Sequence, residues 1–239
     1  MLSILIPVYN YNAFPLAETI ERQALKLGIV YELICIDDGS FSPLNEQNQN
    51  INTLTNCKFI ENLKNIGRAA NRKALAEMAQ YKWLLFLDAD VIPKQDNFIE
   101  SYLNELNRTS EVFFGGFSYY KTKPPKNKTL RTAFGKHREE VSALIRNKNL
   151  YKVIISSNFL IQKQVFLKIN QAERANVYGL DYLFGALLKL HKIKIKHIDN
   201  EVYHLGIDDN ISYLKKTKEA METLAYLYSA KSIQSNSIS

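Results

Sequence analysis

The first half of the chain alternates short apolar runs with stretches whose apolar residues recur at helical spacing. Three apolar runs have the length of a strand, at 2–8, 30–36 and 83–87, and each ends at a polar or acidic turn. Runs of this kind are typical of strands buried on both faces of a parallel sheet. Between the first two runs the apolar residues keep a helical spacing, at Leu16, Ile20, Ala24 and Leu27. The pattern predicts an α/β fold with a mostly parallel central sheet flanked by helices.

The same periodicities predict the remaining elements. Further strands are predicted at 58–61, 111–118, 153–161 and 192–198. Further helices are predicted at 67–81, 94–107, 139–145, 183–190 and 211–229, the last with an apolar face of Leu214, Met221, Leu224, Ala225 and Tyr228. Residues 42–56 are predicted as a weak helix within a loop, and the basic stretch 119–138 as an exposed loop rather than a flap over an anionic acceptor.

Length favours one domain over residues 1–229. Its parts are a nucleotide-binding half (1–118), an acceptor-binding half (119–210) and a C-terminal helix (211–229), followed by a polar tail (230–239).

Charge and cysteine content narrow the classes of ligand. The chain has 31 Lys and Arg against 24 Asp and Glu, a net charge of +7, which suits sugar nucleotides, lipid phosphates or a membrane surface. Cys35 and Cys57 have no C-x-x-C partner, which argues against a disulfide framework or a zinc cluster. No apolar stretch approaches the roughly 20 residues of a membrane span, and the first residues lack a secretion-signal pattern. We expect a cytoplasmic protein, with peripheral contact to the inner face of the membrane as an additional option.

An acidic turn follows the apolar run 83–87. Asp88 and Asp90 are two residues apart, so in an extended chain both carboxylates point the same way, at the strand end where open α/β sheets bind ligands. Two carboxylates forced together repel each other unless a cation joins them. The turn therefore indicates a metal site, and the alternative is two solvated turn residues.

Residues 7–14 follow the first strand and contain no glycine. This excludes the glycine-rich phosphate loops of dinucleotide-binding folds and P-loop proteins at that position. A nucleotide bound to this sheet would need its countercharge from a metal and from basic side chains. Arg68 and Arg72 lie one turn apart at the start of a predicted helix, where cations oppose the helix dipole, so a bound anion explains them better than helix stability does. The alternative is two solvated arginines.

Four motifs within the first 90 residues resemble, in order and spacing, the signatures of family-2 glycosyltransferases with the GT-A fold. They are Ile6-Pro7-Val8-Tyr9-Asn10, Ile36-Asp37-Asp38-Gly39-Ser40, Asn65-Ile66-Gly67-Arg68 and Leu87-Asp88-Ala89-Asp90. The resemblance implies a nucleotide-binding set of Pro7, Tyr9, Asp37, Asp38, Asn65, Gly67, Arg68, Arg72, Asp88 and Ala89. Within it the first four would hold the base, the arginines would lie near ribose or phosphate, and Asp88 and Asp90 would meet ribose and metal. The chain has Asn71-Arg72 where the family often has Arg-Asn, which makes the role of Arg72 less secure than that of Arg68.

The second half resembles the family at two further positions. Gly179-Leu180-Asp181 precedes a predicted helix where the family has Gly and then Glu-Asp, so the resemblance implies that Asp181 is the catalytic base, with Leu180 in place of the Glu. The alternative is a helix cap, for which Asp is well suited. His204, beyond the last predicted strand, resembles the third metal ligand of many GT-A enzymes. The alternative is a structural histidine.

Together these features predict an inverting glycosyltransferase of polysaccharide biosynthesis. It would move a sugar from a nucleotide-diphosphate sugar, with a UDP-sugar favoured, to a hydroxyl of a saccharide or lipid-linked acceptor. Hard oxygen ligands favour Mg²⁺ or Mn²⁺ as the cofactor, held by Asp88, Asp90 and His204. The alternatives are a metal-dependent nucleotidyltransferase and a non-catalytic protein that binds sugar nucleotides or polyanions. No nucleic acid partner is expected, and the oligomeric state stays open.

Overall fold

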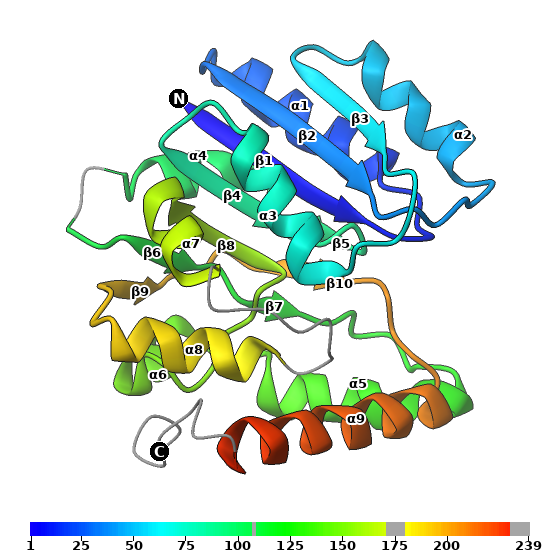
Figure 1. The fold of residues 1–239 in the computed structure, drawn as a ribbon, viewed down its shortest axis with the longest axis vertical. Coiled ribbons are helices and arrows are strands. Elements are labelled where there is room, and N and C mark those ends of the chain that lie inside the picture. The colour runs from blue at the N-terminus through cyan, green and yellow to red at the C-terminus, as the bar shows by residue number, and fades with distance from the viewer. Residues whose placement is uncertain (107–108, 171–179, 230–239) are drawn as a thin grey trace.

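A seven-stranded sheet forms the centre of the molecule, shown in Figure 1. The computed structural model describes residues 1–106, 109–170 and 180–229. The strands run in the order β3-β2-β1-β4-β8-β6-β9. Their bounds are β1 (Leu2–Val8), β2 (Tyr31–Asp37), β3 (Cys57–Glu61), β4 (Trp83–Leu87), β6 (Val112–Phe114), β8 (Asn158–Gln162) and β9 (Ile195–His197). Only β8 runs antiparallel to its neighbours β4 and β6, so the sheet is mostly parallel, as predicted.

Helices cover both faces of this sheet. On one face lie α1 (Phe14–Lys26) and α4 (Phe98–Leu103), and on the other α3 (Arg68–Met78), α7 (Lys163–Asn170) and α8 (Leu180–Leu190). Strand β4 shows why its sequence is apolar throughout. Leu85 and Leu87 pack into the core on the α1 side, whereas Leu84 and Phe86 pack into the core on the α3 side, because successive side chains of a strand point to opposite faces.

A second, three-stranded sheet brings distant segments to the end of β4. Its order is β5-β10-β7, with β5 (Val91–Pro93), β10 (Val202–His204) and β7 (Phe117–Ser118). Strand β5 pairs antiparallel with β10, and His204 lies opposite Val91. This register places His204 beside Val91, the residue that follows Asp90.

The remaining elements are short turns of helix and one helical layer. The short ones are α2 (Asn45–Asn48), α6 (Ala143–Arg146) and the 3₁₀ turns η1 (Gln49–Thr53), η2 (Lys126–Lys128) and η3 (Asn147–Asn149). The layer consists of α5 (Thr129–Arg138) and α9 (Asn210–Ser229), which lie side by side at one end of the molecule, opposite β3 and α2 (Figure 1). No helix in the described part of the chain is long and apolar enough to cross a bilayer.

Several predicted elements differ from the structure. The strand predicted at 153–161 begins only at Asn158, as β8, and the helix predicted at 139–145 begins only at Ala143, as α6. Three further elements also differ. The strand predicted at 111–118 is divided into β6 and β7 at Gly115-Gly116, where Gly116 has a φ of +90° and a Cβ would lie 2.7 Å from the guanidinium of Arg146. The basic stretch 119–138 is not a loop throughout, because its second half forms η2 and α5. The helix predicted at 94–107 is shortened to α4, because the backbone N–H of Lys94 bonds to the carbonyl of Glu201 and extends the small sheet.

The face predicted for the C-terminal helix is correct only in part. Leu224 of that face is partly buried, but Leu214, Met221 and Ala225 are exposed on α9, and Tyr213, outside the predicted face, is partly buried. The side chain of Tyr228 lies outside the described residues. Periodicity identifies an apolar stripe, but it does not say which side of the helix the rest of the protein covers.

Candidate active site

Three strand ends and their turns meet at one edge of the sheet. Val8 of β1 lies opposite Asp37 of β2, and β4 runs parallel to β1 with Leu5 opposite Phe86. The chain passes from β1 outward to β2 and β3 and then returns to β4 on the other side of β1. The crevice at such a change of direction is where open α/β sheets bind ligands. The polar residues that follow β1, β2 and β4 therefore line one site.

The two acids at the end of β2 hold the backbone of this edge. Asp37 accepts hydrogen bonds from the backbone N–H and the hydroxyl of Ser40, at 2.8 and 2.7 Å. Asp38 accepts bonds from the backbone N–H groups of Ile66 and Gly67, each at 2.8 Å. Both carboxylates are buried. Asp38 thereby ties the Asn65–Arg68 motif to the end of β2, and the base contact predicted for it stays a prediction.

Gly39 explains how the two motifs pack so closely. A Cβ at Gly39 would lie 2.3 Å from the carbonyl carbon of Lys64 and 2.6 Å from the backbone N of Asn65, and its φ is +63°. No L side chain fits that space or that conformation without strain. Tyr9, by contrast, follows β1 with 60% of its surface exposed. Its ring is therefore open to a ligand at the same edge.

Asp88 is bound by two arginines rather than left free. Its carboxylate accepts hydrogen bonds from Arg68 at 2.8 Å, from Arg72 at 2.5 Å and from the hydroxyl of Ser157 at 2.5 Å. Arg72 also donates to the carbonyl of Ser156 at 2.8 Å. Burial alone would raise the pKa of Asp88, but the charges of Arg68 and Arg72 together with these hydrogen bonds lower it to about 2.

The sequence predicts an anion near Arg68 and Arg72. In the structure this anion is the carboxylate of Asp88, which follows strand β4. Arg72 is the more deeply held partner, with 10% of its side chain exposed against 49% for Arg68. Arg68 is therefore the one that can also reach a ligand in the crevice, whereas Arg72 fixes the position of Asp88.

Asp90 and His204 form a second polar pair. Their Oδ2 and Nε2 atoms are 3.4 Å apart, and the carbonyl of Asp90 accepts a hydrogen bond from the backbone N–H of Leu205 at 2.8 Å. A Cβ at Gly206 would lie 1.9 Å from the Asp90 carboxylate, so only glycine leaves room for it. Burial and then the charge of Asp90 raise the pKa of Tyr11, which places that phenol in the same region.

A network behind His204 fixes the orientation of its ring. The imidazole stacks on Phe117 with ring centroids 5.1 Å apart, and its Nδ1 lies 3.4 Å from Nη2 of Arg131. Arg131 in turn pairs with Glu139 at 2.9 Å, and the hydroxyl of Tyr119 donates to the same carboxylate. Burial alone would lower the pKa of Arg131, but the charge of Glu139 stabilises the guanidinium and raises it. The buried Nη1 of Arg131 finds no hydrogen-bond partner in the described part of the chain.

Asp90 and His204 are a carboxylate and an imidazole whose Oδ2 and Nε2 atoms lie 3.4 Å apart, and both could contribute ligands to Mg²⁺ or Mn²⁺. Within the described residues, no group of three or more His, Cys, Asp or Glu side chains could hold a metal ion. A metal here would therefore take its remaining ligands from water and substrate phosphates, as Mg²⁺ commonly does. Asp88 accepts hydrogen bonds from both arginines, and its predicted part in the metal site stays a prediction.

The other predicted residues divide into placed and unplaced ones. Pro7 lies in β1, Asn65 is exposed beside the Asp38 turn, and Ala89 is buried between the two acids. Asp181 lies in the first turn of α8, but its side chain is outside the described residues, so its role as base or helix cap stays a prediction.

Sequence reasoning missed the residues around His204, namely Tyr119, Arg131 and Glu139. Their one sequence signal is the small pair Thr132 and Gly135, both buried on the inner face of α5. A Cβ at Gly135 would lie 2.1 Å from the ring of Tyr119. Small residues three apart within a basic run indicate a helix packed close to its neighbours, which predicts the helix but not its partners.

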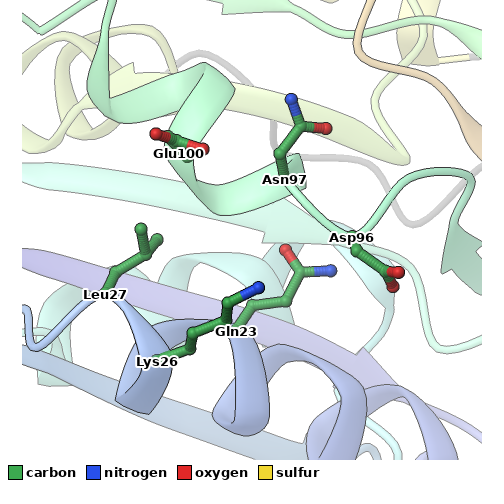
Figure 2. A pocket seen from close by; sticks show the side chains of 6 residues that line it. All are labelled: Gln23, Lys26, Leu27, Asp96, Asn97 and Glu100. Carbon is green, nitrogen blue, oxygen red and sulfur yellow. The ribbon is translucent and has the colours of Figure 1, made fainter.

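A separate depression of about 130 Å³ lies between the last turns of α1 and the start of α4. Figure 2 shows its lining, which comes from the α1 end on one side and from the residues at the start of α4 on the other. The amide of Gln23 is already used, since it donates to the carbonyl of Gln95 and accepts from the N–H of Ile99. None of the residues that follow β1, β2 or β4 lines this depression, so it is not part of the candidate site.

The α/β fold, with its mostly parallel central sheet between helices, is that of GT-A glycosyltransferases. The chain belongs to glycosyltransferase family 2, because the family model described as "Glycosyl transferase family 2" matches residues 3–169, more than half of the sequence. This confirms the resemblance inferred from the four motifs. Comparison with the curated proteins finds no match.

Solved structures with the same fold include S. aureus TarS. TarS 1–349 has a TM-score of 0.59 at 16% identity, covering 84% of this chain and 59% of that chain. Its complex with UDP-GlcNAc has a TM-score of 0.59 at 18% identity, covering 84% and 57%, and its complex with UDP has 0.57 at 18% identity, covering 84% and 59%. This chain thus spans less than two thirds of the TarS chains, and the likeness shows the fold.

Proposed function

We propose that this glycosyltransferase moves a sugar from a UDP-sugar to a hydroxyl of a saccharide or lipid-linked acceptor, with inversion at the anomeric carbon. One observation carries the proposal. The Asp88–Asp90 turn, the arginine pair of α3 and His204 lie together at the switch point of a family-2 glycosyltransferase sheet. The TarS structures with UDP-GlcNAc and UDP support a uridine nucleotide as the donor.

The base would lie at the ends of β1 and β2. The exposed ring of Tyr9 offers a stacking surface, and Asp38 holds the loop that precedes α3 through the backbone of Ile66 and Gly67. Base recognition in this proposal depends on that held loop as well as on any direct bond from Asp38. Loss of the Asp38 carboxylate would then release the loop and weaken nucleotide binding.

The diphosphate would lie between Arg68 and the Asp90–His204 pair. Arg68 is half-exposed and can donate to phosphate while Arg72 keeps Asp88 in place. Mg²⁺ or Mn²⁺, when bound by Asp90 and His204, supplies positive charge to the departing diphosphate. Fixed cationic groups aimed at the charge that develops in the transition state usually contribute more to such catalysis than any other single effect.

The acceptor hydroxyl would need a base on the side opposite the nucleotide. Asp181, at the start of α8, is the residue we assign to this role on the strength of the family resemblance. Deprotonation of the hydroxyl lets its oxygen attack the anomeric carbon as the diphosphate leaves, which inverts the configuration. A lipid-linked acceptor would bring the enzyme into peripheral contact with the inner face of a membrane.

The direct test is incubation with a panel of nucleotide sugars in the presence of Mg²⁺ or Mn²⁺, followed by measurement of the released nucleoside diphosphate. We expect slow, metal-dependent release of UDP from one UDP-sugar, lost in Asp90→Asn. Asp96→Asn, an exposed acid on the α4 side, is the matched control and should keep full activity. Release of pyrophosphate from a nucleoside triphosphate would favour a nucleotidyltransferase instead. Tight binding without turnover would favour a non-catalytic binder.

A further inference from the structure

The excess positive charge of the chain is confined to one segment. Residues 119–138 contain seven Lys and Arg and no Asp or Glu, while the whole chain has 31 and 24, so the two signs balance outside this segment. Arg131 is the member that is turned inward, against Glu139 and His204. Four others are exposed, namely Lys121, Lys123, Lys126 and Arg138. The net charge of +7 therefore equals the charge of this one segment, and four of its cations are exposed.

Exposed apolar side chains accompany this charge. On α9, Ile211, Leu214 and Met221 are 81%, 57% and 61% exposed. Residues three, seven and ten apart lie on one side of a helix, so these three form a single stripe. On α5, Leu130 and Phe134 are exposed as well. Scattered exposed apolar residues are ordinary, but a repeated stripe on neighbouring helices marks an interaction surface.

The two helices present these residues at the same end of the molecule. The backbone N–H of Leu130 donates to the side chain of Asn210 at 3.0 Å, which sets Ile211 beside α5. The rings of Phe134 and Tyr213 are 5.9 Å apart. Figure 1 shows α5 and α9 together as the outermost layer at that end. We call residues 121–138 and 210–226 the basic-apolar end.

We propose that the basic-apolar end binds the surface of an anionic lipid bilayer. The lysines alone would suit any polyanion, but the exposed stripe of α9 gains nothing from a soluble polyanion. A bilayer offers both an anionic headgroup layer and an apolar phase within a few ångströms of it. A helix with an apolar stripe and flanking lysines lies in that boundary, and basic residues near it are attracted to the anionic surface.

This inference extends the membrane contact of the proposed function. It rests on the proposed function only for the reason why the protein would meet a membrane. Binding to lipid needs neither donor nor acceptor, so failure of the lipid test would leave the transfer reaction untouched, and the reverse also holds. The inner face of α5 carries Arg131 to His204, while its outer face carries Leu130 and Phe134. A bilayer at this end would therefore lie on the acceptor side of the site, one helix away from His204.

The test is co-sedimentation of the full chain with vesicles. The vesicles are pure phosphatidylcholine, or phosphatidylcholine with a quarter of phosphatidylglycerol, each at low and at high salt. The charge variant is Lys121→Gln, Lys123→Gln and Lys126→Gln together. Its matched control is Lys26→Gln, Lys58→Gln and Lys82→Gln, which removes the same charge from exposed lysines outside this end. The apolar variant is Leu214→Glu with Met221→Glu, and its control is Leu25→Glu with Val30→Glu, also exposed side chains.

We expect binding to the anionic vesicles that falls at high salt, because exposed charges are screened. Each lysine near an anionic surface contributes about fivefold in affinity, so the charge variant should bind on the order of 100-fold more weakly. The apolar variant should lose at least about tenfold, and both controls should bind as the unaltered chain does. Leu214→Trp adds a reporter whose emission should shift to the blue on vesicles, since the single Trp83 is buried in β4.

Three results would overturn the proposal. In the first, the charge variant and the apolar variant sediment with the vesicles as their controls do. In the second, the chain binds soluble polyphosphate as tightly as vesicles and the apolar variant binds unchanged, which would make the surface a polyanion site. In the third, light scattering shows a dimer that the apolar variant abolishes while vesicle binding is absent, which would make the stripe of α9 a contact between two copies of the chain.

Discussion

Removal of the charge of Asp88 should destabilise the protein in a pH-dependent way. Burial would raise the pKa of Asp88, but Arg68, Arg72 and Ser157 lower it from 3.8 to about 2. At 1.36 kcal/mol for each pH unit, this corresponds to about 2.5 kcal/mol of the free energy of unfolding at neutral pH. Asn has the same shape, but its NH₂ group replaces one acceptor oxygen, so Asp88→Asn removes the charge together with hydrogen bonds that this oxygen accepts. We expect it to lower the free energy of unfolding by about 2 kcal/mol at pH 7, since Arg68 is half-exposed and partly screened.

The sign of the pH dependence follows from the lowered pKa. A carboxyl whose pKa is depressed by folding contributes its stability fully above the unfolded value near 3.8, and loses it as the pH falls toward the folded value near 2. Below that value the unaltered protein also carries a neutral Asp88. The difference in stability between the unaltered chain and Asp88→Asn should therefore be constant above about pH 5 and shrink toward zero near pH 2.

Urea unfolding followed by the fluorescence of Trp83 measures this difference, because the single tryptophan lies in β4, which leads into Asp88. Asp96→Asn is the control, since this acid is exposed. Its stability should follow that of the unaltered chain at every pH. A difference for Asp88→Asn that stays the same between pH 6 and pH 2.5, or that is below about 0.5 kcal/mol at pH 6, would refute the account of the arginine cluster.

Three further predictions concern the proposed reaction. Asp90→Asn should abolish transfer and metal-dependent nucleotide binding while urea unfolding stays unchanged, and activity undiminished by excess chelator would contradict the metal role. Asp38→Ala should weaken UDP binding by about 1.5–3 kcal/mol in calorimetric titration, because it removes a charged acceptor from the loop that ends at Gly67; an unchanged affinity would leave the acid structural. Asp181→Asn should keep donor affinity and lower turnover by roughly 10²–10⁴-fold, and near-normal turnover would leave Asp181 a helix cap, a role that Asn fills equally well.

The sequence predicts well those parts of the fold that depend on neighbouring residues. Strands β1, β2 and β4 are predicted by apolar runs that end at a polar or acidic turn. The reason is that a strand buried on both faces is apolar at successive positions. The contacts of those turns were not predictable in the same way. Asp88 pairs with Arg72, sixteen residues earlier, and only the parallel crossover through α3 brings them together. The four motifs predict that these residues lie at one edge of the sheet, but not the ion pairs between them.

The second half of the chain is harder to predict from the sequence, because its part of the candidate site depends on contacts between distant segments. His204 and Arg131 are 73 residues apart, and no periodicity links them. The charge of the 119–138 stretch predicts an exposed loop, but Arg131 lies on the buried side of α5 and only four of the other six cations are exposed. A basic run with small residues at Thr132 and Gly135 is better described as a helix with one charged and one close-packed face.

The arginines of the candidate site and the exposed cations of the basic-apolar end differ in what neutralises their charge. Arg68 and Arg72 are matched by Asp88 within the crevice, so an incoming diphosphate gains less from them than their charge suggests, which is why the Asp90–His204 pair and its metal matter to the donor. The exposed cations of residues 121–138 have no Asp or Glu within that segment. Their charge is available to an external anion. Donor binding should thus depend on metal, and contact with a surface should depend on salt, because the first charge is compensated inside the fold and the second is not.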